Sequence, residues 1–315
     1  MLDKVAVLIP CYNEEITIGK VIDDFRKELP NAEIYVYDNN SSDKTSEIAK
    51  QHGAIVRAES RQGKGNVVRS MFMDISADYY IMVDGDDTYP AEYVHQLLAP
   101  MKQGIADMTI GDRLSNGTYS NENKRNFHDF GNNLVKNMIN YLYKSNIQDI
   151  MTGFRGFNKY FVKTFPILSP GFEIETELTI HCVENGFLVK EIQIDYRDRP
   201  EGSESKLNTF SDGFKVIKMI LGMLRDSKPL FFFGLLSFIF LIFGLLTGIP
   251  VINEFIKTGF VAKLPSAVLA VGLVIISILC FFVGLILDTH NNSYKKLYRL
   301  ELIKYKNMNG TDFDE

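Results

Sequence analysis

Tryptophan is absent from the 315 residues, and cysteine is scarce, with three widely separated residues. These cysteines show neither the spacing of a zinc site nor a disulfide framework, which fits a reducing compartment. The formal net charge of −5 argues against a general nucleic-acid-binding protein. The first residues, Met1-Leu2-Asp3-Lys4, lead directly into a short strand-like run, so no signal peptide is expected.

Two nucleotide-binding motifs are also missing. The stretch from Gly63 to Val68 lacks the third glycine of the dinucleotide-binding fingerprint, and no P-loop pattern occurs in the sequence. Gly63 and Gly65 would still permit a ligand to approach the backbone closely, with Lys64 as an available cation. An ordinary glycine-rich connection explains this stretch equally well.

Alternating strand and helix patterns dominate the first part of the chain. Apolar runs of strand length at 5–9, 33–37, 54–57 and 79–83 are separated by helical patterns, and a further strand-like run lies at 188–196. Polar loop residues follow each of the first four runs. This arrangement predicts an α/β domain with a mostly parallel sheet flanked by helices, and a site along one rim of the sheet.

The most informative loop follows the run at 79–83 and reads Asp84-Gly85-Asp86-Asp87. In an open α/β sheet, ligands bind beyond the carboxyl ends of the strands. Several carboxylate oxygens at that position suit a hard divalent cation, Mg²⁺ or Mn²⁺. The alternative is an acidic turn without a ligand, because Asp and Gly are common turn residues.

The last third of the chain contains two long uncharged runs, at 230–247 and 264–287. A membrane-spanning helix needs roughly 20 apolar residues, and each run is long enough to meet this requirement. Before them, apolar residues from Phe210 to Leu224 recur at helical spacing, opposite a basic face. This pattern predicts an amphipathic helix in the headgroup layer, although packing against a soluble domain is the alternative.

Basic residues flank the two apolar runs, while the loop between them carries only Glu254, Lys257 and Lys263. Positively charged flanks stay in the cytoplasm. We therefore expect a cytoplasmic domain at 1–208, an amphipathic juxtamembrane helix at 209–228, a two-helix transmembrane hairpin at 229–290 and a cytoplasmic tail at 291–315. The protein would then be a multi-pass protein of the cell membrane with both termini in the cytoplasm.

A metal-type acidic cluster suggests a substrate with phosphates, and a membrane tether suggests that the second substrate is a lipid. Cationic residues in loops could receive a lipid phosphate. These residues are Arg113, Arg125, Arg199 and Lys206. Each of them alone is more often a solvated surface charge.

Seven short motifs in order give the chain a resemblance to the family 2 glycosyltransferases. Within them it resembles the polyprenyl-phosphate glycosyltransferases related to dolichol-phosphate mannose synthase, over roughly residues 4–228 and into the two-helix membrane part typical of the bacterial glucosyl members. The motifs are Pro10-Cys11-Tyr12-Asn13-Glu14, Asp38-Asn39-Asn40-Ser41-Ser42-Asp43, Gly63-Lys64-Gly65, Asp84-Gly85-Asp86, Gly111-Asp112-Arg113, Thr152-Gly153-Phe154-Arg155 and the stretch Arg199 to Leu207.

The resemblance implies a GT-A fold for residues 1–208 and an inverting, metal-dependent transfer of a sugar from a nucleotide sugar to undecaprenyl or another polyprenyl phosphate. UDP-glucose is the first candidate donor, from the two-helix subfamily alone. The product would be a lipid-linked sugar for cell-envelope glycan modification. The family also implies a homo-oligomer, a tetramer in some members.

Roles carried over by resemblance fall into four groups. The nucleotide sugar would contact Pro10, Tyr12, Glu14, Asp38, Lys64, Asp84, Gly85 and Asp86. The metal, Mg²⁺ or Mn²⁺, would be held by Asp86 and Asp84. The lipid phosphate would meet Arg113, Arg125, Arg199 and Lys206, and Asp149 matches the carboxylate usually proposed as the catalytic base, acting with Asp86 and Arg113.

Two departures from the family pattern affect these roles. Asn39 and Asn40 stand where many relatives have an aspartate and a glycine, which leaves the base and ribose contacts open. Thr88 stands where some relatives have an amide side chain beside the metal, which leaves the third protein ligand open.

A phosphate monoester, with a second pKa near 6, is largely dianionic at neutral pH and can attack without a general base. Asp149 is therefore interpreted as either a base or an orienting residue.

Other functions are compatible with parts of the pattern. The sugar could be GlcNAc, mannose or another, because its identity depends on the shape of the pocket. A polysaccharide synthase is disfavoured because such relatives carry a Gln-x-x-Arg-Trp motif and this chain has no Trp. A non-catalytic membrane scaffold is disfavoured by the intact Asp84, Asp86 and Arg113.

Overall fold

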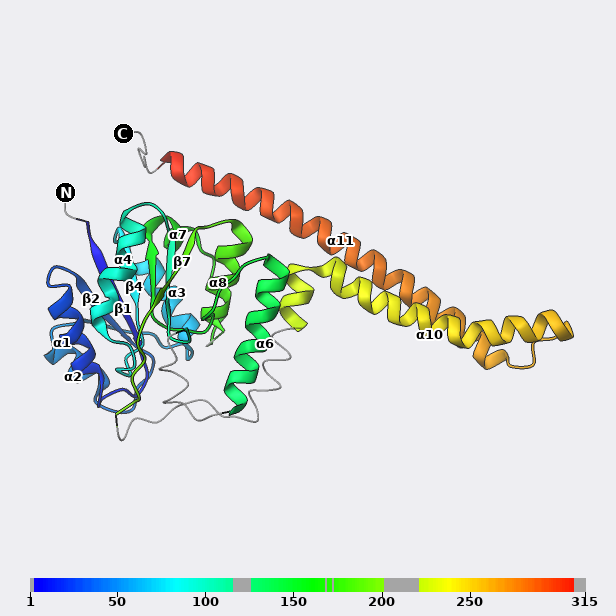
Figure 1. Cartoon of the computed structure of the whole chain (residues 1–315), viewed down its shortest axis with the longest axis horizontal. Helices are drawn as coiled ribbons and strands as arrows, with labels where there is room; N and C mark the ends of the chain where they lie inside the picture. The colour runs from blue at the N-terminus through cyan, green and yellow to red at the C-terminus, as the bar shows by residue number, and fades with distance from the viewer. Residues whose placement is uncertain (1–2, 116–125, 168, 172, 201–220, 309–315) are drawn as a thin grey trace. The chain divides into compact units, whose positions relative to one another are not determined.

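The computed structural model describes residues 3–115, 126–167, 169–171, 173–200 and 221–308 (Figure 1). The chain divides into two compact units, Met1–Thr209 and Phe210–Glu315. Of the amphipathic helix predicted at 209–228, residues 209–220 lie outside the described residues, and residues 221–227 are helical.

The first unit contains a seven-stranded sheet in the order β3-β2-β1-β4-β6-β5-β7. β6 is antiparallel to both of its neighbours, and the other pairs are parallel. The mostly parallel sheet expected from the sequence is thus confirmed, and the carboxyl ends of every strand except β6 meet at one edge. The strands are β1 Val5–Cys11, β2 Glu33–Asp38, β3 Ile55–Ala58, β4 Tyr79–Met82, β5 Met108–Asp112, β6 Arg155–Asn158 and β7 Val189–Gln193.

Helices cover both faces of this sheet (Figure 1). They are α1 Ile18–Glu28, α2 Thr45–Gln51, α3 Lys64–Asp74, α4 Val94–Lys102, α6 Asn126–Tyr143, α7 Lys159–Thr164 and α8 Ile174–Asn185, with a 3₁₀ turn η1 at Ala91–Tyr93. β1 is buried along nearly its whole length because both of its faces are covered. Its continuous apolar run, Val5 to Ile9, is what a strand in that position requires.

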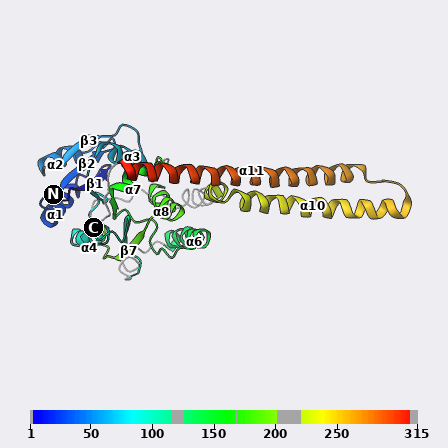
Figure 2. The same cartoon turned by 90° about the horizontal axis from the view of Figure 1, so that it is seen from above.

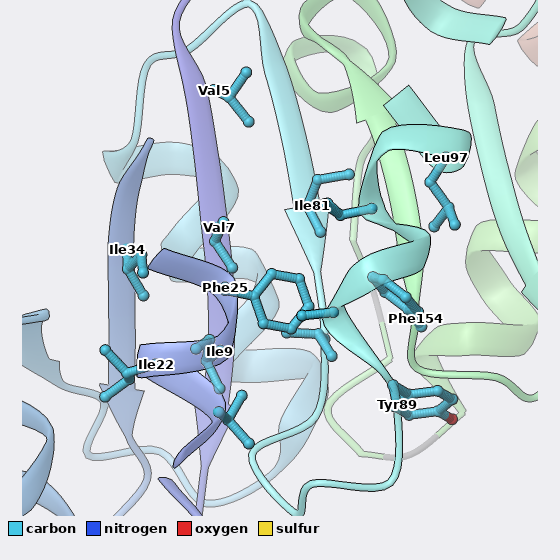
Figure 3. Close-up of a cluster of buried hydrophobic side chains, with 14 of the residues drawn as sticks. Val5, Val7, Ile9, Ile22, Phe25, Ile34, Ile81, Tyr89, Leu97 and Phe154 are labelled. Carbon is cyan, nitrogen blue, oxygen red and sulfur yellow. The ribbon is translucent and has the colours of Figure 1, made fainter. Parts of the chain in front are cut away.

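One core layer joins the sheet to α1 and α4. Val7 and Ile9 of β1 pack with Phe25 of α1 and Leu97 of α4 (Figure 3). The Phe25 ring meets the ring of Phe154 edge to face, with centroids 5.8 Å apart. On the other face, aromatic rings of α3 and α7 pack against Tyr80 and Phe157. Each large side chain buried in this way contributes about 1.5–3 kcal/mol. These two layers fix the strands whose ends carry the polar loops.

The second unit contains a hairpin of two long helices, α10 Pro229–Thr258 and α11 Leu264–Met308 (Figure 2). Both are long and apolar enough to cross a membrane. Buried small or short residues recur every seven positions on each helix, at Ser237, Gly244 and Val251 and at Ala270, Ser277 and Gly284. A seven-residue repeat keeps one seam of a helix facing its partner. The Ser277 hydroxyl donates to the Ser237 carbonyl at 2.8 Å in this seam.

α11 continues without a break beyond the apolar run at 264–287. Residues 291–308 of the expected cytoplasmic tail are therefore helical, and only 309–315 lie outside the described residues. A helix of 45 residues is about 68 Å long, far more than the roughly 30 Å of the hydrocarbon layer.

Candidate active site

The loops after β1 and β2 are joined into one wall. The backbone N–H of Asn13 donates to the Ser41 hydroxyl at 2.9 Å, and the Asn13 side-chain oxygen accepts from the backbone N–H of Ser42 at 2.8 Å. The backbone N–H of Glu14 donates to Thr45 at 2.8 Å. Asn13 adopts a positive φ of 54°, a conformation that Asn tolerates better than most residues. These hydrogen bonds between the two loops place Pro10, Tyr12, Glu14 and Asp38 on adjacent segments at the same edge of the sheet.

Asn39 fastens this wall to the loop after β3. Its buried side-chain amide donates to the carbonyls of Glu59 and Arg61, at 2.9 and 2.8 Å, and its oxygen accepts from the N–H of Gly63 at 2.7 Å. The Asn at this position is thus a structural crosslink between loops. Asp38 is the carboxylate that remains beside it, and it accepts the backbone N–H of Ser41 at 3.2 Å.

Lys64 lies between two carboxylates. Its ammonium is 2.5 Å from Asp84 Oδ1 and 2.5 Å from Glu175 Oε1, and the side chains of Lys64 and Glu175 are almost completely buried. Burial alone would lower the pKa of Lys64, but the attraction of Asp84 and Glu175 outweighs it and raises that pKa. The amine is therefore charged, and it offsets part of the negative charge at the sheet edge.

The glycines on either side of Lys64 allow this burial. A Cβ at Gly63 or Gly65 would collide with the backbone of Ser169 and Pro170, and Gly63 has a φ of 127°. The N–H of Gly65 donates to the carbonyl of Gly171 at 3.1 Å. The Gly-Lys-Gly loop is thus held under the segment that precedes α8. It places the Lys64 ammonium between the carboxylates of Asp84 and Glu175.

The acidic loop after β4 separates its three carboxylates. The Asp84 carboxylate lies against Gly153, where any side chain would collide with it. Asp86 is buried, and one of its oxygens accepts the Thr88 hydroxyl at 2.7 Å while the other accepts Arg199 Nη2 at 2.5 Å. Asp87 has a positive φ of 59°, and its side chain pairs with Lys20 at 2.7 Å. Asp87 is therefore a turn residue with its own ion pair.

Asp84 and Asp86 fit a divalent cation by their chemistry. Burial raises the pKa of Asp86, the charge of Asp84 adds to this shift, and the Arg199 guanidinium opposes it. Two nearby carboxylates in a poorly hydrated place gain most from a divalent cation. In the described part of the chain no group of three or more His, Cys, Asp or Glu side chains could hold a metal. Phosphate and water oxygens would have to complete the coordination, as is usual for Mg²⁺.

Arg113, which follows β5, is held from three sides. Its Nε donates to Asp149 at 2.8 Å, its Nη1 donates to the Tyr89 hydroxyl at 3.2 Å, and its guanidinium lies over the Tyr196 ring at 5.5 Å. Asp149 is buried, and the backbone N–H groups of Gln148 and Asp149 donate to Glu191 at 2.7 and 3.0 Å. Asp149 is thus fixed as the ion-pair partner of Arg113.

The Thr152–Arg155 motif connects the two clusters. The Tyr89 hydroxyl accepts the N–H of Gly153 at 3.0 Å. Arg155 is fully buried and donates to the Thr152 carbonyl at 3.0 Å and to Thr179 at 2.9 Å. Arg155 therefore supports the loop from inside and lies away from solvent. Gly153 provides the surface on which Asp84 rests.

The predicted site residues that the structure describes come from distant parts of the chain to this one edge. Arg125 and Lys206 lie outside the described residues. Sequence reasoning gave no role to Glu175, Tyr89 or Glu191, which position Lys64, Arg113 and Asp149. One signal was available for Glu175, because it is an acidic residue on a helix whose neighbours Ile174 and Leu178 are apolar.

The Lys64 ion pairs give a stability prediction. Replacing Lys64 by Met leaves the buried carboxylate of Glu175 and the partly buried carboxylate of Asp84 without their cation, and removing one partner of a buried pair typically costs about 3–5 kcal/mol. We expect a clear fall in the midpoint of thermal unfolding of the full-length protein in detergent, followed by circular dichroism. Adding Glu175→Gln to Lys64→Met should recover part of the loss, because it removes one of the two anions.

Lys20→Met is the matched control. Lys20 also bridges two carboxylates, Asp24 and Asp87, but its side chain is 52% exposed. Exposed pairs contribute about 0–1 kcal/mol. Equal stability of the Lys64→Met and Lys20→Met variants would contradict the assignment of Lys64 as the buried counter-ion.

Residues 6–165 match the family model described as glycosyl transferase family 2. Glycosyltransferase AglJ of Haloferax volcanii is 32% identical over 95% of this chain and 99% of its own length. A dolichyl-phosphate hexose transferase of the same organism is 29% identical over 72% of this chain and 96% of its own length.

Among solved structures, the fold is similar to that of glucosyl-3-phosphoglycerate synthase from Mycobacterium tuberculosis in complex with Mn²⁺ and UDP-glucose. The TM-score is 0.55 with 20% identity, over 71% of this chain and 79% of that one. The similarity at this identity establishes the fold, and the GT-A type fold expected from the sequence is confirmed. The family match and the near full-length relative agree with the motifs at the sheet edge, and the chain belongs to glycosyl transferase family 2 as a glycosyltransferase.

Proposed function

We propose that the protein transfers a hexose from a nucleotide sugar to a polyprenyl phosphate, with UDP-glucose and undecaprenyl phosphate as the first candidates. The main support for this proposal is that the carboxylates of Asp84 and Asp86 lie at the same sheet edge as the cationic side chains of Lys64, Arg113 and Arg199. The chain also contains two helices of membrane-spanning length. The name of one relative, a dolichyl-phosphate hexose transferase, supports the acceptor. The UDP-glucose complex of a structure with the same fold supports the donor.

The part of the site that would bind the donor consists of the hydrogen-bonded loops after β1 and β2, the Gly-Lys-Gly loop and the acidic loop after β4. Pro10, Tyr12, Glu14 and Asp38 would contact the nucleoside, and Lys64, Asp84 and Gly85 would lie nearer the diphosphate. Asp86 and Asp84 would hold Mg²⁺ or Mn²⁺, which when bound offsets the negative charge that develops on the departing diphosphate. Thr88 orients Asp86 through its hydroxyl.

The acceptor side consists of cations. Arg113 and Arg199 would bind the lipid phosphate, together with Arg125 and Lys206 from outside the described residues. A phosphate monoester is largely dianionic at neutral pH, so its oxygen can attack the anomeric carbon directly. A single displacement of the diphosphate inverts the configuration there. In this proposal Asp149 orients Arg113 and removes no proton, because its carboxylate is buried in the ion pair with that residue.

The reaction would take place at the cytoplasmic face of the cell membrane. Residues 1–208 would form the catalytic domain and 229–290 the membrane hairpin. Basic residues concentrate outside the hairpin loop, as expected when both ends are cytoplasmic. The product would be a lipid-linked hexose for the modification of a cell-envelope glycan.

Lipid extraction tests the reaction. Membranes that contain the protein, incubated with radiolabelled UDP-glucose, polyprenyl phosphate and Mn²⁺, should transfer label into the organic phase. Asp86→Asn should reduce this transfer by about 10²-fold or more, a typical loss for one contact that stabilises transition-state charge. Asp87→Asn is the matched control, since Asn also tolerates the positive φ of 59° at this position. Label that stays in the aqueous phase with UDP-glucose, UDP-GlcNAc and GDP-mannose alike would refute the proposal.

The role of Asp149 can be separated from that of a base. Asp149→Asn keeps an oxygen for Arg113 Nε, so we expect turnover at saturating substrates to fall by about tenfold, the effect of weakening one charged hydrogen bond. A catalytic base contributes about 10²–10⁴-fold. A larger loss, with disappearance of the acidic limb of the pH–rate profile, would identify Asp149 as the base.

Reporter fusions test the topology. Alkaline phosphatase fused after Lys257 should be active and green fluorescent protein at the same point should be dark, because the hairpin loop would face away from the cytoplasm. Fusions after Met308 should give the opposite pattern. A loop fusion that fluoresces would overturn the predicted orientation.

A further inference from the structure

Asp86 differs from the other two carboxylates of its loop in the origin of its counter-ion. Asp84 pairs with Lys64, which is buried at the start of α3, and Asp87 pairs with Lys20 of α1. Asp86 pairs with Arg199, which lies in an irregular segment after β7 and is 29% exposed. Two of the carboxylates therefore have partners fixed on helices, while the partner of Asp86 comes from a connecting segment.

The segment that carries Arg199 is anchored just before it. The backbone N–H of Arg197 donates to the Thr88 carbonyl at 3.0 Å, and the Tyr93 hydroxyl donates to Asp195 at 2.7 Å. These bonds hold the segment against the loop that contains Asp86. Arg199 comes two residues after the last of these anchors, so its guanidinium can leave Asp86 by side-chain rotation while the anchors stay in place.

The Asp86 carboxylate has little room for a second cation beside this guanidinium. One oxygen accepts Thr88, the other accepts Arg199, and the side chain is only 6% exposed. Arg remains charged at every physiological pH. A divalent cation and the guanidinium would repel each other at close range in a poorly hydrated place. Metal binding to Asp86 therefore requires that Arg199 move.

We propose that Arg199 is a displaceable counter-ion, which holds Asp86 before the metal–nucleotide complex binds and is transferred to the acceptor phosphate when it does. This inference rests on the proposed function, because it needs a metal on Asp86 and a phosphate acceptor. It predicts ordered binding, with donor and metal first. Coupling of this kind is reciprocal, so metal–nucleotide binding strengthens acceptor binding by the factor by which the acceptor strengthens metal binding.

Metal titration tests the exchange without measuring activity. Mn²⁺ binding to the full-length protein in detergent, with saturating UDP, can be followed by electron paramagnetic resonance. Arg199→Gln removes the competitor and should tighten Mn²⁺ binding by about tenfold, within the usual range of coupling between sites. The same variant should weaken binding of a short-chain polyprenyl phosphate in the presence of Mn²⁺ and UDP.

Arg197→Gln is the matched control. Arg197 belongs to the same segment and lies 4.0 Å from Asp87 and 3.2 Å from Glu92, so its loss changes the local charge equally. We expect Mn²⁺ affinity to change less than twofold in this variant, on the scale of an exposed ion pair. If the two substitutions changed the Mn²⁺ affinity equally, Arg199 would act only through long-range repulsion. That result would contradict the proposed exchange of Arg199 between Asp86 and the acceptor phosphate.

The remaining outcomes separate this inference from the proposed function. If Asp86→Asn abolishes Mn²⁺ binding but Arg199→Gln leaves it unchanged or weaker, the metal site stands and the exchange is wrong. If no variant shows Mn²⁺ binding that depends on Asp86, the metal site itself is wrong, and the exchange fails with it.

Discussion

The folded structure depends on compensating the negative charge of carboxylates that are packed together at one edge of a mostly parallel sheet. Asp84, Asp86 and Glu175 lie within reach of two cations, Lys64 and Arg199, and most of these side chains are buried. An unpaired charge in such a place would be strongly destabilising. The surrounding loops are therefore arranged first of all to bring opposite charges together, and the site inherits its geometry from that arrangement.

Close backbone approach makes this packing possible. Gly85 leaves no room for a Cβ beside the Cys11 side chain, Gly153 lies against the Asp84 carboxylate, and Gly63 and Gly65 lie close to the backbone of the segment before α8. A Cβ would collide with the Asp84 carboxylate at Gly153, with the Cys11 sulfur at Gly85, and with the backbone of Ser169 and Pro170 at Gly63 and Gly65. The reversed strand β6 has the same effect at a larger scale. Because it runs opposite to its neighbours, its first residue, Arg155, comes to the edge where the other strands end, and so does the motif that precedes it.

Local pattern was sufficient for much of this fold. The apolar runs ending at the acidic and polar loops predicted β1 to β4, and their shared edge followed from the parallel order. β6 carried no such signal, because its four residues, Arg155–Asn158, include no apolar run and its place depends on pairing with β4 and β5. The site, too, could be predicted only in part. Its motif residues could be identified from the sequence, but Lys64 and Glu175 are 111 positions apart, so no local pattern could predict their ion pair.

The ion pairs also restrict how anionic substrates can bind. Lys64, Arg113 and Arg199 each have a carboxylate partner, so the edge does not carry a positive charge ready for phosphates. A second anion can bind there if it shares a guanidinium with that residue's carboxylate partner, if a pair exchanges partners, or if a further cation arrives with it. Arg113 is poorly suited to exchange, because Asp149, Tyr89 and Tyr196 fix it from three sides. Arg199 lies on a connecting segment, and its side chain is 29% exposed. The cation that arrives with the nucleotide would therefore act on Arg199 before any other residue of the described site.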